Sequence, residues 1–473
     1  MSGRRKPTYF YIFSLAYLTR VHFHLAVYLK NQHLYCFTIM LLIYLPQISP
    51  RIEYVFDLVF KQEWKIDYRI THEKQTFENY QHEKINYSGS RFNNEFFIHS
   101  HSLLSEDLIE KKNVLVEEKH GTKVLFATDD PCDLDFDIFS AIFYMVSRYE
   151  EYLPFTPDVY GRFPAAESLA FQHNFLQKPV VNTWLDIFKN ELLKRFPSLK
   201  IKPGSFGAVL TYDIDIAYKF KGRSFYRTLG SAGKDILQLR FKNIVDRIRT
   251  VSNRQKDPWD IYENLEEMIA KNNLNTIFFF LLGDKTSLDK NLSHTNTSMI
   301  KLINKIRAFS ELGIHPSFTT SDFAEKIFIE KERLEKISGN KIAKSRQHFL
   351  RMRFPDTYNS LIAAGISEDY SMGFPDAPGF RAGTCKPFYF YDLKFKKATG
   401  LKIFPVTCMD ATFIHYSKNS AEKSLVAILN LMKEVKKAGG LFLPIWHNNY
   451  LGEKKWKSVH DKTILQIKAY LKK

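Results

Sequence analysis

The sequence has few cysteines and no long apolar run. These two features argue against a disulfide-stabilised protein and against a membrane-spanning helix at the start of the chain. Four cysteines occur in 473 residues (Cys36, Cys132, Cys385 and Cys408), and none of them forms a CxxC pair. Neither a disulfide framework nor a thiolate zinc knuckle is indicated, and a reducing, cytoplasmic compartment is expected. The apolar start of the chain is interrupted by Arg20 and Lys30, so it contains no uninterrupted span of about 20 apolar residues.

Several functional signatures are also missing. No GxSxG elbow occurs, which disfavours a Ser/His/Asp hydrolase. No zinc finger, helix-turn-helix glycine turn or RNA-binding aromatic motif accompanies the basic composition, so nucleic acid is not an expected partner. A hydrophobic content of 45% with 15% aromatics and 25% charged residues is typical of a globular chain with a full core.

The positive charge is concentrated in two segments. The formal net charge is +17, from 68 Lys and Arg against 51 Asp and Glu. Residues 1–39 carry +5 and residues 219–256 carry +9, which leaves the rest of the chain nearly neutral at +3. The high charge therefore points to one insertion and one terminus rather than to a basic protein.

Composition divides the chain into a leader and two halves. Residues 1–39 fit no targeting class, so we expect them to be upstream sequence or a disordered leader before a start at Met40. Residues 40–200 alternate short apolar strands with helices and predict a smaller α/β domain of unknown role. The turn-forming residues of KPGSFG, at 202–207, mark the boundary with a second domain at 205–473.

The second domain shows a regular alternation of apolar strands and amphipathic helices. Its candidate strands are residues 208–212, 276–282, 312–316, 345–350, 368–372, 403–408 and 441–446. Seven strand–helix steps predict a parallel sheet that is closed, or nearly closed, into a seven-stranded barrel. In such folds the chemistry gathers at the carboxyl ends of the strands.

Polar residues follow these predicted strands selectively. They are two carboxylates in TYDID, a histidine in GIHPS, an arginine and a histidine in SRQH, a carboxylate in CMD and a histidine in PIWHNN: Asp213, Asp215, His315, Arg346, His348, Asp410 and His447. A carboxylate and neutral imidazoles can hold a divalent cation, with zinc favoured, and leave a position open for water. A second carboxylate can then act as general base, and a histidine on the opposite wall can protonate the leaving group.

The pieces TYDID, GIHPS, GFRAGTCKPF and LPIWHNN, in this order, resemble the NodB-type polysaccharide deacetylases of carbohydrate esterase family four. The resemblance covers residues 205–473, and residues 40–200 resemble the uncharacterised N-terminal domain of some bacterial members. It implies a distorted (β/α) barrel that removes N-acetyl groups from a cell-surface or lipid-linked polysaccharide with one divalent ion. Carried over, Asp213 is the general base, Asp215 and His315 are metal ligands, and His447 is the general acid.

One metal ligand of the family's second motif is missing from its usual place. The position four residues after His315, where the family usually has another histidine, is Thr319. His348 at the next strand end could supply the missing ligand; alternatively Thr319, Ser317 and water complete a weaker site. We favour His348.

Other assignments follow from the order of the motifs. Arg346 is our choice for the arginine that holds the base, and Arg381 in GFRAG is a substrate-contact candidate together with Thr384 and Trp446. Asp410 matches the region from which an acid tunes the catalytic histidine. The departures leave one rival function, a catalytically silent glycan-binding module of the same fold.

The basic insertion at 219–256 contains an amphipathic helix with apolar residues at helical spacing between Arg and Lys. It could simply pack over the barrel with a solvated charged face. Alternatively it contacts an anionic membrane or a lipid-linked glycan, which would place the protein peripherally at the inner membrane surface.

Overall fold

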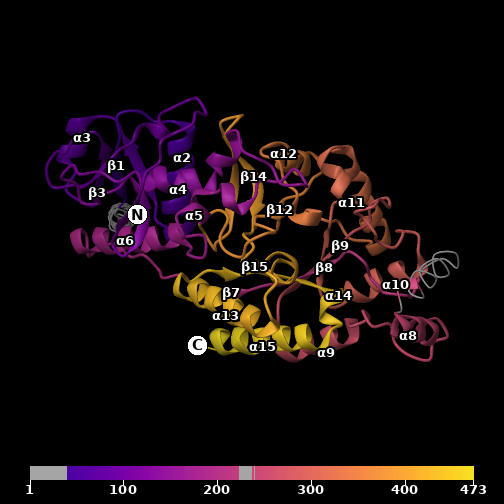
Figure 1. Ribbon diagram of the computed structural model, residues 1–473. Coiled ribbons are helices and arrows are strands. Elements are labelled where there is room, and N and C mark those ends of the chain that lie inside the picture. Colours follow the sequence, from indigo (N-terminus) through magenta and orange to yellow (C-terminus); the bar gives the residue numbers. More distant parts are fainter. Residues whose placement is uncertain (1–39, 223–236, 239, 473) are drawn as a thin grey trace, which may run out of the picture.

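The computed structural model describes residues 40–222, 237–238 and 240–472, so the expected leader at 1–39 and part of the basic insertion lie outside the described residues. The chain forms two α/β regions, with the indigo and magenta N-terminal region at one end of an elongated molecule (Figure 1). No helix of these described ranges combines the length and apolarity that a membrane span needs.

The N-terminal region is built on a parallel four-stranded sheet of order β2-β1-β3-β4. Its strands are β1(Leu41–Tyr44), β2(Tyr68–Thr71), β3(Lys84–Ser88) and β4(Phe96–His99), and a separate hairpin consists of β5(Val116–Lys119) and β6(Thr122–Leu125). Its helices are α2(Pro50–Phe56), the π-helix η1(Asp57–Trp64), α3(Lys74–Asn79), α4(Ile138–Val146), α5(Leu169–Gln172) and α6(Val180–Arg195).

Helix α4 forms the centre of this region. All nine of its residues are buried, and its composition is apolar on every side, which suits a helix enclosed by its domain. Asp137 caps its first turn by accepting a hydrogen bond from the Ser140 N–H, as expected for an aspartate that precedes an apolar run.

The second region contains a nine-stranded sheet of order β13-β14-β12-β11-β10-β9-β8-β17-β15. Its strands are β8(Leu210–Ile214), β9(Thr276–Phe280), β10(Glu311–Ile314), β11(Lys344–Ser345), β12(Glu368–Asp369), β13(Phe388–Asp392), β14(Lys397–Ile403), β15(Cys408–Met409) and β17(Pro444–His447). A short ladder joins β7(Gly207–Ala208) to β16(Leu441–Phe442). All ladders of the large sheet are parallel except that between β13 and β14.

Helices connect most of these strands. They are α8(Phe241–Val251), α9(Tyr262–Asn272), α10(Thr297–Ile306), α11(Glu325–Ser338), α12(Asp356–Ala363), α13(Ala421–Lys437), α14(Asn448–Leu451) and α15(Lys454–Leu471). Figure 1 shows α13, α15 and α9 together along one side of the sheet. The order of strands and helices confirms the predicted mixed α/β class.

The predicted seven-stranded closed barrel is not what the ladders show. In the described part of the chain the pairing order runs openly from β13 to β15, because the hairpin β13–β14 adds two strands beside β12. The chain between β14 and β15 hydrogen-bonds to strands near both ends of this pairing order. Phe404 N donates to Asp369 O of β12 (2.8 Å), and Thr407 N donates to Leu443 O, directly before β17 (2.9 Å). The predicted strand 345–350 is also too long, since β11 ends at Ser345 and a 3₁₀ turn, η6(His348–Leu350), follows.

Buried charges join the two regions. Arg381 donates to Glu151 through Nε (2.9 Å) and Nη2 (2.5 Å), and Arg148 donates to the same carboxylate through Nε (2.7 Å). Burial raises the pKa of Glu151, but Arg381 and Arg148 outweigh it and hold this pKa below its usual range. The carboxylate is therefore an anion shared by two buried guanidinium groups.

Replacing Glu151 by Gln should lower the free energy of unfolding by about 3 to 5 kcal/mol at pH 7, because two buried arginines lose their counter-charge. The folded-state pKa is depressed, so this stabilisation is present at neutral pH and is lost as the pH falls through the acidic range. Urea unfolding at pH 7 and pH 4 measures it. Glu118→Gln, at an exposed carboxylate, is the control and should behave like the unaltered protein.

Candidate metal centre

Two aspartates, separated by one residue, lie at the carboxyl end of β8. Asp213 lies within the strand, and Asp215 lies one residue beyond its end. Side chains two residues apart on a strand point to the same face, so both carboxylates are directed to one side of the sheet. Asp213 is buried, whereas about a third of the Asp215 side chain is exposed, which leaves Asp215 accessible from solvent.

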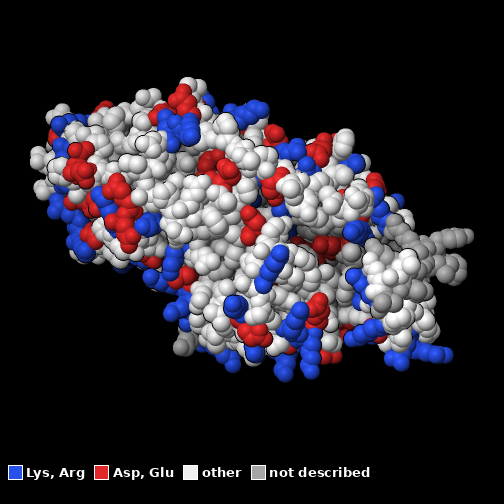
Figure 2. Space-filling view, in the orientation of Figure 1, with Lys and Arg blue, Asp and Glu red and all other residues white. Residues whose placement is uncertain are grey.

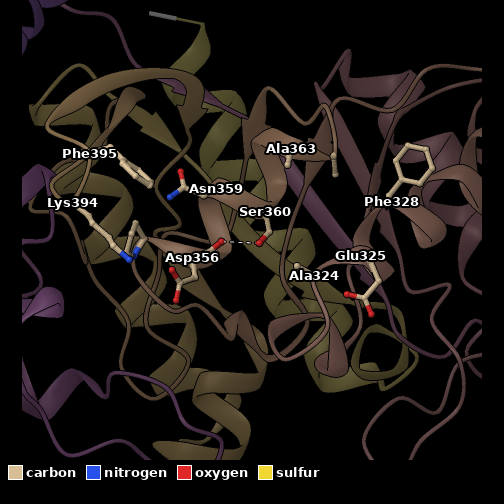
Figure 3. Close-up of a pocket in the computed structure, with 11 residues that line it drawn as sticks. Ala324, Glu325, Phe328, Asp356, Asn359, Ser360, Ala363, Lys394 and Phe395 are labelled. Atoms are coloured by element: carbon tan, nitrogen blue, oxygen red, sulfur yellow. Dashed lines mark hydrogen bonds between the residues drawn. The ribbon is translucent and has the colours of Figure 1, made fainter.

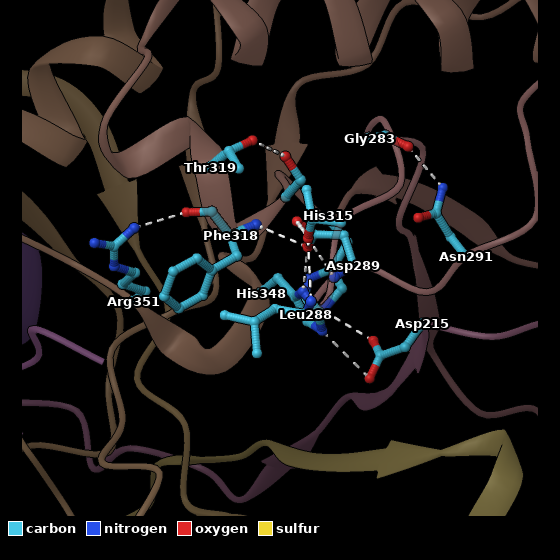
Figure 4. Close-up of polar contacts among 12 residues, drawn as sticks. Asp215, Gly283, Leu288, Asp289, Asn291, His315, Phe318, Thr319, His348 and Arg351 are labelled. Carbon is cyan, nitrogen blue, oxygen red and sulfur yellow. Dashed lines mark hydrogen bonds and ion pairs between the residues drawn. The ribbon is translucent and has the colours of Figure 1, made fainter. Parts of the chain in front are cut away.

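Two histidines from neighbouring strand ends point at Asp215 (Figure 4). His315 follows β10, and its Nε2 lies 3.2 Å from Asp215 Oδ1. His348 opens the turn η6 after β11, and its Nε2 lies 3.6 Å from Asp215 Oδ2. One ligand atom from each of the three residues lies within 4.8 Å of the others, which is the arrangement of a possible metal-binding triad.

The other nitrogen of each imidazole is fixed by an acceptor. His315 Nδ1 contacts the Arg346 carbonyl oxygen at 2.6 Å, and His348 Nδ1 contacts Asp289 Oδ1 at 2.8 Å. Because carbonyl and carboxylate oxygens only accept, both Nδ1 atoms carry a proton, and Nε2 is the nitrogen of each ring that can offer a lone pair to a metal ion. This is the tautomer and the supporting arrangement of histidines that bind metals.

The donor set at Asp215 fits a divalent cation. Asp215 Oδ1 is buried and has no hydrogen-bond partner, although an imidazole nitrogen is close. Burial raises the pKa of Asp215, but His348 and His315 outweigh it and hold this pKa well below the usual range of an aspartate. Burial likewise lowers the pKa of His348, yet Asp215 and Asp289 raise it to about 9. The site thus favours a positive charge between the carboxylate and the imidazoles, and a divalent ion can supply it.

Thr319 does not join this cluster. Its hydroxyl lies 3.1 Å from Ser317 Oγ, and Ser317 in turn is bound by Glu330, which accepts from its N–H (2.9 Å) and its hydroxyl (2.5 Å). Burial raises the pKa of Glu330 to about 7, which the two Ser317 hydrogen bonds only partly offset. Of the two candidates for the third ligand, His348 has an imidazole nitrogen 3.6 Å from Asp215 Oδ2, whereas the Thr319 hydroxyl contacts Ser317.

A second histidine–carboxylate pair approaches from the other side. His447 ends β17, and its Nδ1 lies 2.6 Å from Asp410 Oδ1, while Asp410 Oδ2 accepts from the His447 N–H (2.7 Å). His447 Nε2 lies 3.8 Å from Asp215 Oδ2, so the ring faces the triad. Burial lowers the pKa of His447, but Asp410 and Asp215 outweigh it and raise this pKa to about 10.

Arg346 connects the first aspartate to the ligand set. Its Nη1 donates to Asp213 Oδ1 (2.7 Å), its Nε donates to Tyr370 O (2.9 Å), and its own carbonyl accepts from His315. The guanidinium is fully buried over the Phe279 ring, at 4.4 Å from the centroid. Arg346, rather than Arg381, therefore holds the carboxylate of Asp213.

The three expected substrate contacts lie elsewhere. Arg381 is buried against Glu151 at the junction of the two regions, and Thr384 donates to Asn182 Oδ1 (3.1 Å) in the same junction. Trp446 is buried and packs edge-on against the His460 ring. All three side chains are enclosed by protein, and the expectation that they touch substrate stays a prediction.

The sequence pattern gave no sign of Asp289, the acceptor that orients His348. Its carboxylate is fully buried and also accepts from the Phe318 N–H (2.9 Å) and from the Thr286 hydroxyl (3.0 Å). Asp289 lies in the loop after β9, nine residues beyond the strand end. A search limited to residues directly after a strand could not find it, but a search of the whole loop would have.

One surface pocket of about 560 Å³ lies away from the triad (Figure 3). It is lined by α11, α12 and the turn between β13 and β14, including Phe328, Asn359 and Phe395. None of its residues belongs to the triad or to the two carboxylate pairs around it, so we do not assign the chemistry to this pocket.

Replacing His348 by Ala should abolish stable binding of zinc, whereas Thr319→Ala should bind about one equivalent like the unaltered protein. The reason is that His348 supplies an Nε2 to the triad and Thr319 does not. Metal content after dialysis, measured by atomic emission, compares the two variants. Loss of zinc only in Thr319→Ala would contradict the assignment.

A comparison with family models matches the N-terminal region. Residues 41–197 match a family of unknown function (DUF7033), so the expected N-terminal region of unknown function is present. None of the curated proteins matches the chain.

Solved structures give low-level similarity over a little more than half of the chain. A Mycobacterium smegmatis protein assigned as a polysaccharide deacetylase has a TM-score of 0.39 and 15% identity, covering 57% of this chain and 85% of that one. The PuuE allantoinase has a TM-score of 0.37 and 10% identity, covering 56% and 84%. A pseudoenzyme of the CE4 family from Bacillus anthracis has a TM-score of 0.27 and 9% identity, covering 57% and 62%.

Proposed function

We propose that the protein is a metal-dependent hydrolase that removes N-acetyl groups from a polysaccharide. The observation that carries the proposal is the convergence, at one edge of the sheet, of the triad Asp215, His315 and His348 with two further pairs: Asp213 on Arg346, and His447 on Asp410. Each pair provides one half of general acid–base catalysis, and the triad provides a ligand set.

Asp215, His315 and His348 would hold the ion, for which zinc is our candidate, because one carboxylate and two imidazoles are a common zinc ligand set. When bound, the ion supplies Lewis acidity to a carbonyl oxygen and lowers the pKa of a coordinated water. Asp289 and the Arg346 carbonyl fix the two rings so that both Nε2 atoms stay directed at the same point.

Asp213 is suited to act as the general base. Arg346 donates to its Oδ1, which fixes the orientation of the carboxylate. Asp213 Oδ2 lies 3.8 Å from His315 Nε2, so it borders the ligand set without completing it. In this position Asp213 can accept a proton from the water that attacks the N-acetyl carbonyl.

His447 is suited to act as the general acid on the opposite side. Asp410 fixes its Nδ1 proton, which directs Nε2 toward the centre. With a pKa raised to about 10 the imidazole carries a proton at neutral pH. His447 can therefore protonate the amine nitrogen as the C–N bond breaks, while Asp410 stabilises the ring in both states.

The substrate class rests on the four motifs that resemble NodB-type deacetylases. A catalytically silent glycan-binding module is the rival function, and it requires neither an ionised base nor a protonated acid. The ordered pairs Asp213–Arg346 and His447–Asp410 favour an enzyme. Each pair buries a charged group, which carries a desolvation penalty, and binding a glycan does not require such a group.

Replacing Asp213 by Asn should reduce acetate release from N-acetylated oligosaccharides by at least about 100-fold while zinc content stays near one equivalent. The base is lost, but the triad is intact. Acetate is quantified by an enzyme-coupled assay over a panel of oligosaccharides with the zinc-loaded protein. Asp284→Asn, at an exposed aspartate, is the control. Full activity of Asp213→Asn would contradict the mechanism, and inactivity of the unaltered protein on every sugar would favour the silent module.

We further propose that α8 contacts an anionic membrane surface. Its apolar side chains face solvent: Phe241, Val245, Ile248 and Val251 are 60%, 44%, 61% and 57% exposed. The polar Arg247 and Thr250 face the protein instead, with the Arg247 guanidinium 4.8 Å from the centre of the Phe220 ring. A helix that packs on its own domain normally buries its apolar side chains and exposes its polar ones, so α8 shows the opposite arrangement.

Exposed basic residues flank this apolar stripe, among them Arg240, Lys242 and Arg249. Figure 2 shows Lys and Arg side chains along the same lower edge of the molecule, over α15, α9 and α8. An apolar stripe between basic residues suits insertion into an anionic leaflet better than contact with a soluble glycan. A peripheral membrane location is proposed on this basis.

The double variant Phe241→Ser/Ile248→Ser should bind vesicles containing phosphatidylglycerol roughly 10- to 100-fold more weakly, because two side chains that would enter the leaflet become polar. Co-sedimentation with anionic and with neutral vesicles measures the affinity. Phe395→Ser/Leu115→Ser, at two similarly exposed positions away from α8, is the matched control. Equal binding of all proteins to neutral vesicles would contradict the proposal.

A further inference from the structure

The chain directly after His348 adopts a backbone conformation that bulky residues rarely take. Phe349 has φ 61° and ψ 9°, and Leu350 has φ 50°, so two successive residues with large side chains lie in the left-handed region. Such conformations persist only where surrounding contacts impose them, and they are concentrated at functional sites. Neighbouring groups must therefore hold this segment in place beside a proposed metal ligand.

Arg162, from the N-terminal region, holds the strained segment. Its Nη1 donates to Phe349 O (2.7 Å), its Nη2 donates to Tyr416 OH (2.9 Å), and its Nε donates to Asp158 Oδ2 (2.7 Å). The side chain is only 2% exposed. A buried cation thus fixes the first carbonyl after His348, and its own position is fixed by Asp158.

A second set of contacts runs from the same loop to the imidazole of His348. Arg351 donates through Nε to Tyr160 O (2.9 Å) and through Nη1 to Phe318 O (2.9 Å). The Phe318 N–H donates to Asp289 Oδ1, the same oxygen that accepts from His348 Nδ1. Figure 4 shows this line of contacts from Arg351 through Phe318 and Asp289 to His348.

Both sets begin within residues 158–162, which lie in the part of the chain that matches a family of unknown function. One set fixes the main chain that carries His348, and the other fixes the acceptor that orients its ring. Aromatic packing supports the arrangement, since the Tyr160 ring lies 5.0 Å from the Phe349 ring. Together these contacts leave His348 little freedom to turn away from Asp215.

We propose that the loop 158–162 positions His348 for the divalent ion, with Arg162 as the positioning residue. The inference rests on the proposed function, because it needs the metal centre, but it adds a role for the N-terminal region. That region is then a structural part of the metal centre rather than a separate binding module. Removal of an outer support of a ligating histidine typically weakens metal binding, which makes the idea measurable.

The test measures the zinc affinity of the full-length protein by competition with a chromogenic chelator. Arg162→Gln removes the cation and the donor to Phe349 O. Asp158→Asn is the second variant, because Asp158 is partly exposed and its loss loosens Arg162 with little risk to folding. Arg91→Gln, at an exposed arginine of the same region, is the matched control. Thermal unfolding of each zinc-free protein sets a working temperature at which all variants are folded.

We expect Arg162→Gln to bind zinc about 10-fold more weakly than the unaltered protein, Asp158→Asn to lose affinity in the same direction, and Arg91→Gln to be unchanged. The visible spectrum of the cobalt-substituted protein should shift in Arg162→Gln and not in Arg91→Gln, since a displaced imidazole changes the ligand geometry. A purely structural role would lower the unfolding temperature without changing either readout at the working temperature.

Unchanged zinc affinity and an unchanged cobalt spectrum in both Arg162→Gln and Asp158→Asn would overturn the inference while the metal centre stands. Absence of zinc binding by the unaltered protein would overturn the metal centre itself. The two failures are therefore distinguishable.

Discussion

The structure depends on the need to place a positive charge between Asp215 and two imidazoles. The carboxylate keeps an unpartnered oxygen beside His315, and both histidines direct Nε2 at the carboxylate because their Nδ1 protons are donated elsewhere. Without a metal ion, a proton on His348, whose pKa is raised to about 9, balances the carboxylate, and a divalent ion would take the place of that proton. This charge balance involves several elements: the strand ends carry Asp215 and His315, the turn η6 carries His348, and the loop after β9 carries Asp289.

Arg346 links this requirement to the acid–base groups. Its guanidinium fixes Asp213, and its carbonyl fixes His315, so the base and a metal ligand are set by the same residue. Asp215 plays a similar double part, because it faces His348 on one side and His447 on the other. Because Arg346 and Asp215 each contact two of these groups, the distances between the proposed base, ligands and acid are fixed. Catalysis depends on such fixed distances between the reacting groups.

Much of the site could be predicted from the sequence, because parallel strands bring their carboxyl ends to one edge. That rule places Asp215, His315 and His348 among seven polar candidates, and the resemblance to NodB-type deacetylases then suggested their roles as ligands. It cannot find Asp289, which lies in a long loop, or Arg162, which reaches the site from the other region. The hairpin β13–β14 was not predicted either, since its turn carries lysines rather than Gly or Pro, and it is this hairpin that extends the sheet beyond the expected seven strands.

The boundary near residue 200 separates two stretches of sequence but does not separate two independent units. Glu151 and Arg381 bury opposite charges across it, and Arg162 buries another cation against the segment that follows His348. Charges removed from water are costly unless their partners are held in place, so these contacts favour the docked arrangement of the two regions. Under the proposal above, the position of His348 depends on both regions, because Arg162 of the N-terminal region restrains the backbone that follows it.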